Sequence, residues 1–145
     1  MEFINRLIHA LTEVHPTHPM IVHFPIALTG SAFLFILLAY WRKSSSLEQT
    51  AFANIVLASI GTVAAGITGY LDNIKNYEGD APNASTKIIL AISLFILTAT
   101  ISIVRYRNPD LFQKSNPFLY AASYGLSFGI ALVLAFLGGV ILYGF

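Results

Sequence analysis

Residues 19–41 read PMIVHFPIALTGSAFLFILLAYW, a stretch without Asp, Glu, Lys or Arg. A bilayer core about 30 Å thick needs about 20 apolar residues in a helix, so this stretch predicts one membrane-spanning helix. Three further segments meet the same criterion, at about 51–71, 86–106 and 117–143. Backbone groups in hydrocarbon must be hydrogen-bonded internally, and no segment alternates like a barrel strand. The sequence therefore predicts an all-α fold, an integral membrane four-helix bundle.

The composition agrees with this class. Of 145 residues, 56% are hydrophobic and 10% are charged, whereas soluble domains average about 45–50% and about 25%. The net charge of +1 excludes a nucleic-acid binder, which would need a basic stripe. The absence of cysteine excludes disulfide frameworks, iron–sulfur ligation and thiol catalysis. No phosphate-binding loop or HExxH motif is present, which favours a protein that is not an enzyme.

The first fifteen residues form a separate unit. Their apolar side chains recur at helical spacing, at Phe3, Leu7, Ile8, Leu11 and Val14. This pattern predicts a short amphipathic helix on the membrane surface. We thus expect an interfacial helix at 1–15 and a four-span domain at 16–145.

The basic residues predict the orientation. Five lie in or beside the loops after the first and third spans: Arg42, Lys43, Arg105, Arg107 and Lys114. Three lie on the opposite side: Arg6, Lys75 and Lys87. The positive-inside rule then places the first group in the cytoplasm, with both termini and the 72–85 loop outside the inner membrane.

All four histidines lie in the first 23 residues, at His9, His15, His18 and His23. Imidazole is a common ligand of metals and of haem iron. His18 and His23 are therefore candidate ligands of haem b or another tetrapyrrole. A divalent metal ion would use oxygen and nitrogen ligands from His15, His18, His23 and Asp72. The alternative is that these histidines are interfacial residues at a helix start.

His23 and Asp72 are the polar residues least comfortably placed in these spans. His23 lies roughly 7 Å into the first span, beside Pro25, which frees the carbonyl of Ile21. Asp72, at the outer end of the second span, has a similar depth. Each of the two residues stands at one end of a stripe on its helix that contains small residues. On the first span the stripe is His23, Ala27, Gly30 and Leu34, and on the second it is Gly61, Ala65, Thr68 and Asp72. We expect a structural polar pair of His23 and Asp72. The alternatives are a bond from His23 to the freed carbonyl, and an Asp72 that caps its helix or binds Lys75.

Small residues also predict where helices pack closely. On the first two spans these are Gly30, Gly61 and Ala65, and on the fourth they are Gly125, Gly129 and Gly139. Small side chains let helix backbones approach in membranes. These positions predict contacts within the bundle or at a dimer seam.

Three motifs resemble those of the bacterial DUF2231 family of four-helix membrane proteins. They are His18-Pro-Met-Ile-Val-His23-Phe-Pro-Ile-Ala-Leu28, Thr68-Gly-Tyr-Leu-Asp72 and Gly138-Gly-Val-Ile-Leu-Tyr-Gly144. Some family members are fused to Rieske or cytochrome c domains, so the resemblance implies membrane electron transfer and haem binding. Members often carry another histidine early in the third span, but residues 86–93 here read TKIILAIS. Two histidine ligands within one chain would thus require His9 or His15. A homodimer sharing His23, or a five-coordinate tetrapyrrole, is the alternative.

Three functions remain open at this level. The first is a membrane protein with a His/Asp polar site at the outer side, associated with electron transfer. The second is a non-catalytic accessory subunit of a larger energy-transducing complex. The third is a small proton or ion transporter that uses His23 and Asp72. The expected partners are the lipid bilayer and either a second copy or a larger membrane complex.

Overall fold

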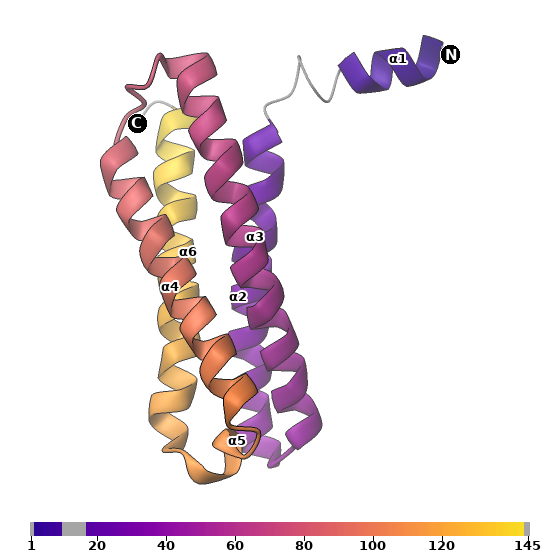
Figure 1. Cartoon of the computed structure of the whole chain (residues 1–145), viewed down its shortest axis with the longest axis vertical. Coiled ribbons are helices and arrows are strands. Elements are labelled where there is room, and N and C mark those ends of the chain that lie inside the picture. Colours follow the sequence, from indigo (N-terminus) through magenta and orange to yellow (C-terminus); the bar gives the residue numbers. More distant parts are fainter. Residues whose placement is uncertain (1, 10–16, 144–145) are drawn as a thin grey trace.

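The structure, a computed structural model, describes residues 2–9 and 17–143. Within these ranges the chain forms six helices and no strand. They are α1 (Glu2–His9), α2 (Thr17–Arg42), α3 (Ser45–Tyr77), α4 (Ala84–Arg107), α5 (Leu111–Lys114) and α6 (Pro117–Tyr143). The four long helices α2, α3, α4 and α6 run along the long axis of the molecule (Figure 1). In the described residues, these four are long and apolar enough to cross a membrane. The predicted all-α membrane bundle is therefore confirmed.

The bounds of α2, α4 and α6 lie within two residues of the predicted spans, whereas α3 is longer than predicted at both ends. α3 begins after Ser44, whose hydroxyl accepts a hydrogen bond from the backbone N–H of Leu47. It ends at Glu78, which has a left-handed φ of 51° and donates its N–H to the Asn73 carbonyl. Both are ordinary helix caps, and they give α3 33 residues against 24 in α4.

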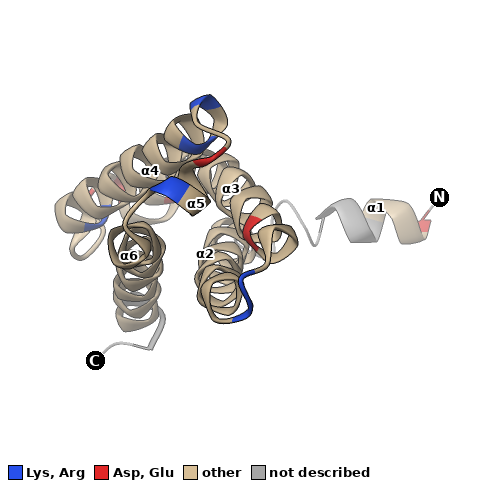
Figure 2. Ribbon diagram, turned by 90° about the horizontal axis from the view of Figure 1, so that it is seen from below, with Lys and Arg blue, Asp and Glu red and all other residues tan. Residues whose placement is uncertain are grey.

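The four long helices form a ring in which each contacts the next, in the order α2, α3, α4, α6 and back to α2. The contact between α2 and α3 is the most extensive. The arrangement is seen end-on in Figure 2. The inner seam of α2 has spacings that alternate between four and three residues: Pro25, Thr29, Ala32, Ile36 and Ala39. Such spacing keeps one helix face toward its neighbours over several turns.

Two glycines interlock α2 with α6. Gly30 faces the ring of Phe128, and an added Cβ would lie 2.9 Å from that ring. Gly125 faces the ring of Phe33 at the same distance. The two rings are 6.4 Å apart between centroids, so each phenylalanine occupies the space that the opposite glycine leaves open.

Of the remaining small residues predicted to pack closely, two lie in helix contacts of the described residues and two do not. Gly61 faces Pro25, and Ala65 is buried. In contrast, no described atom outside their own helix lies within 4 Å of a Cβ at Gly129 or Gly139. These two glycines therefore do not serve packing within the described bundle.

The bundle has two chemically different ends. At one end, the basic end, lie the α2–α3 turn and the α4–α5–α6 connection, with Arg42, Lys43, Arg105, Arg107 and Lys114. At the other, the histidine end, lie the start of α2 and the turn between α3 and α4 (Figure 1). The end of α6 lies at the same end as the start of α2, as an even number of spans requires.

The predicted N-terminal helix is present over Glu2–His9, with Phe3 and Ile4 exposed. Residues 10–15 of the predicted segment lie outside the described residues. The interfacial position of this helix and the division of the chain at residue 15 stay predictions.

Candidate functional site

His18 lies near the start of α2 and packs against α3. Its Nδ1 is 3.3 Å from the Thr68 Oγ1. The Thr68 hydroxyl already donates its hydrogen to the Ala64 carbonyl at 3.0 Å, so the Thr68 oxygen accepts and the His18 Nδ1 donates. In the neutral imidazole the lone pair then lies on Nε2. The ring lies over Gly69, where an added Cβ would be 2.8 Å from the His18 Cε1.

His23 lies on the exposed surface of α2. Its Nδ1 donates to the backbone carbonyl of Pro19, one turn earlier in the helix. No other described residue hydrogen-bonds the imidazole, so Nε2 is free and accessible. A backbone carbonyl that holds Nδ1–H is the usual support of a histidine whose Nε2 binds a metal.

The structure does not bring His23 and Asp72 together, contrary to the interpretation of the sequence. The electrostatic neighbours of Asp72 are His18 and, from α4, Lys87. The alternatives for each residue also differ from what is observed. His23 bonds to Pro19 rather than to the freed Ile21 carbonyl. Asp72 accepts a hydrogen bond from the Asn76 side chain at 2.6 Å rather than binding Lys75.

Helix phase explains this correction. Pro25 lies on the inner seam of α2, and His23, two residues earlier, is rotated by about 200° from it at 100° per residue. Ala27 and Leu34, expected to share an inner stripe with His23, are likewise exposed. His18 is seven residues before Pro25 and therefore returns to the inner side, next to the Thr68–Asp72 segment of α3.

The predicted divalent-metal ligands are not assembled in the described part of the chain. His15 lies outside the described residues, and His18 and His23 are rotated by about 140° from each other on α2. Among residues 2–9 and 17–143, no three His, Asp or Glu side chains are gathered as a metal site requires. A haem iron is less demanding, because one imidazole suffices as its protein ligand.

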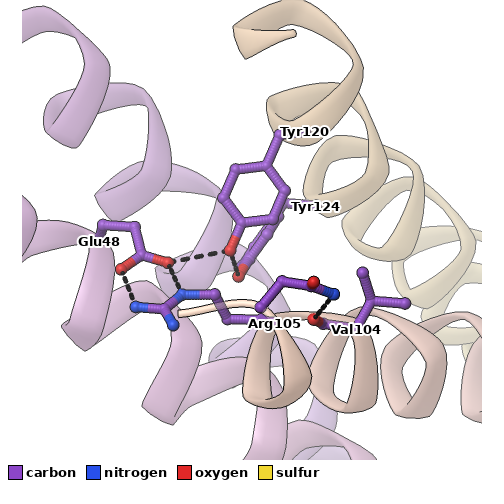
Figure 3. Close-up of polar contacts among 6 residues, drawn as sticks. Glu48, Val104, Arg105, Tyr120 and Tyr124 are labelled. Atoms are coloured by element: carbon purple, nitrogen blue, oxygen red, sulfur yellow. Dashed lines mark hydrogen bonds and ion pairs between the residues drawn. The ribbon is translucent and has the colours of Figure 1, made fainter. Parts of the chain in front are cut away.

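A second polar cluster, absent from the sequence interpretation, lies at the basic end (Figure 3). Glu48 of α3 is 1% exposed and forms a two-point ion pair with Arg105 of α4, with distances of 2.6 and 2.9 Å. From α6, the Tyr120 hydroxyl donates to the same carboxylate at 2.9 Å, and the Tyr124 hydroxyl is 3.2 Å from that of Tyr120. The Arg105 guanidinium also lies over the Phe52 ring, 5.4 Å from its centroid.

This cluster, the Glu48 clamp, joins three helices through one carboxylate. Both carboxylate oxygens and the guanidinium are paired, which is the condition under which a buried ion pair is tolerated. Its hydrogen bonds connect α3 to both α4 and α6. The sequence signal was the apolar series Leu47, Ala51 and Ile55, which continues the helical period across Glu48.

The comparisons with known proteins concern the whole span domain. The family described as "Predicted membrane protein (DUF2231)" matches residues 14–145. No curated protein and no solved structure matches the chain. The matched range includes all four long helices together with His18, His23 and Asp72. The chain thus belongs to the DUF2231 family of membrane proteins, as its three motifs indicated.

Proposed function

We propose that this multi-pass membrane protein binds haem b or a related tetrapyrrole through His23 and takes part in membrane electron transfer. One observation carries the proposal, the hydrogen bond from the His23 Nδ1 to the Pro19 carbonyl. It orients the ring and leaves the Nε2 lone pair accessible at the bundle surface. A neutral imidazole held in this way needs no change of tautomer before its Nε2 binds iron.

The surroundings of His23 suit a flat apolar macrocycle. Met20 and Ala27, one turn away on either side, share its exposed face, and Phe24 is 64% exposed beside it. The small Ala27 leaves room next to the imidazole, while Met20 and Phe24 supply apolar surface. When bound, the iron of such a group supplies reversible one-electron exchange.

The second axial position distinguishes two forms of the proposal. His18 is on another side of α2, so it cannot share a ligand with His23 of the same chain. A second copy would supply the matching His23 and give a six-coordinate iron in a homodimer. Without a second copy, and without a ligand from His9 or His15, the group would be five-coordinate.

The transporter alternative has less support, because four of the five buried Ser and Thr side chains in the described bundle bond to carbonyls of their own helices. These are Thr29, Thr62, Thr98 and Ser127. Hydroxyls used in this way do not form a chain of side-chain bonds along the bundle.

The test is an absorbance spectrum of the purified full chain, expressed with a haem precursor and extracted in mild detergent. We expect a Soret band in the wild type, its loss in His23→Ala, and its retention in His18→Ala as the matched control. A low-spin spectrum would indicate a second histidine ligand, from a second copy or from His9 or His15, and a high-spin spectrum the five-coordinate form. A wild type that binds no haem even after reconstitution with hemin would overturn the proposal, and so would a His23→Ala variant with an unchanged spectrum.

Copurified proteins in the same preparation test the accessory-subunit alternative. A stoichiometric partner in a haem-free preparation would favour that alternative over the proposal.

A further inference from the structure

The basic end carries an apolar groove between α4 and α6, the helix pair with the least extensive packing of the four. The groove has a volume of about 320 Å³ and opens at the surface of the bundle. Its walls are mainly apolar and come from α4, α5 and α6: Leu97, Ile101, Val104, Leu111 and Leu119. Its size is at the lower end of known ligand sites, about 300–1,000 Å³.

A polar cup adjoins this groove beyond the end of α4. The cup also measures about 320 Å³, and it is lined by Arg107, Asp110 and Lys114, among others. Leu111 lines both the groove and the cup, so the two hollows adjoin at this side chain. An apolar groove beside a charged cup suits the two chemically different parts of an amphiphile.

The cup has an excess of positive charge. Lys114 donates to Asp110 at 2.8 Å, and this contact lowers the pKa of the Asp110 carboxyl below its ordinary value, so Asp110 is ionised at neutral pH. Asp110 thus offsets one cation. Arg107 forms no ion pair with any described residue and supplies the remaining positive charge.

We propose that the groove and the cup together bind one anionic phospholipid of the surrounding bilayer. An acyl chain lies along α4 and α6, and the phosphate lies in the cup at Arg107 and Lys114. Basic pockets beside membrane helices attract anionic headgroups in this way.

The Glu48 clamp gives the groove a fixed wall. Tyr120 lines the groove and is bonded to Glu48, so the wall on α6 is tied to α3 and α4. The proposed lipid site and His23 lie at opposite ends of the bundle, and the two proposals can fail separately.

The test is native mass spectrometry of the full chain released from vesicles that contain equal amounts of phosphatidylglycerol and phosphatidylcholine. We expect the wild type to retain phosphatidylglycerol preferentially. Removing the cup cations, in Arg107→Gln with Lys114→Gln, should lower that preference roughly fivefold per cation. The matched control is Arg42→Gln with Lys43→Gln, which removes the same charge at the same end but away from the groove.

A second pair of variants tests the acyl chain. Val104→Trp fills the groove at a position that is already 40% exposed, while Ile103→Trp adds the same side chain outside it. We expect only the first to lose the bound lipid, with helicity by circular dichroism unchanged in both.

Three results would overturn the proposal. They are equal losses in the two charge variants, lipid retention in Val104→Trp, or displacement of the lipid by inorganic phosphate, which would make the cup a plain anion site.

Discussion

The two ends of this bundle treat their scarce polar groups in opposite ways. At the basic end, Glu48 is buried and every one of its oxygens has a partner on another helix. At the histidine end, His18 and His23 use only Nδ1, and Asp72 bonds within its own helix. The comparison distinguishes two uses of polar groups. A buried carboxylate whose oxygens are all paired on other helices stabilises the fold, whereas a histidine Nε2 without a partner among the described residues can bind a ligand.

The largest expected effect comes from neutralising the carboxylate at the basic end. Glu48→Gln leaves the Arg105 guanidinium, 12% exposed, without a counter-charge. Breaking a buried pair from one side costs about 3–5 kcal/mol, and we expect about 3 kcal/mol because Arg105 reaches some solvent. The free energy of unfolding in mixed detergent and SDS micelles measures it.

The double variant Glu48→Gln with Arg105→Gln is the control for that experiment. It leaves no unpaired charge and should regain most of the lost stability. If the single variant were as stable as the wild type, the clamp would not hold the three helices together.

An intermediate effect is expected at the contact of α2 with α6, between the two ends. Gly125→Ala places a methyl group 2.9 Å from the Phe33 ring, and such overpacking costs about 1–3 kcal/mol. Gly129→Ala is the matched control, because nothing described lies within 4 Å of its added Cβ. Thermal unfolding followed by circular dichroism should separate the two variants. Equal melting temperatures would mean that the ring of Phe33 moves aside without cost.

The smallest effect is expected from the same chemical change at the histidine end. Asp72→Asn also turns a carboxylate into an amide, but this side chain is only half-buried and its partner Asn76 is one turn away. We expect the free energy of unfolding to change by less than about 0.5 kcal/mol. A loss as large as that of Glu48→Gln would erase the difference between the ends.

The apolar content of segments of about 20 residues was enough to predict the four spans, because each long helix contains such a segment. α3 was the exception at both ends. Glu48 looked like a loop residue in sequence, since its partner Arg105 is 57 residues away and only the fold brings them together. The last turns of α3 were missed for a different reason. The residues after Leu71 are polar, and a criterion for membrane spans counts apolar residues and not helical ones.

The site depended on helix phase, which the small-residue stripes left ambiguous. His18 and His23 were both named from the sequence, but similar depth and the small-residue stripes favoured His23 as the partner of Asp72. The inner seam is defined by Pro25 and Thr29, and their positions against α3 could be known only once the helices were packed. Thr68, which fixes the His18 tautomer, was assigned to a packing stripe because its hydroxyl has no sequence signature.

The unequal lengths of α3 and α4 have a consequence for the membrane itself. At 1.5 Å per residue, 33 residues measure about 50 Å and 24 residues about 36 Å, against a hydrocarbon core of about 30 Å. The excess must be absorbed by tilt or by emergence from the lipid, and the polar last turns of α3 favour emergence. Bilayer thickness would then control how much of the Asp72 segment reaches water, and acyl-chain length becomes a variable that tunes the surroundings of His18.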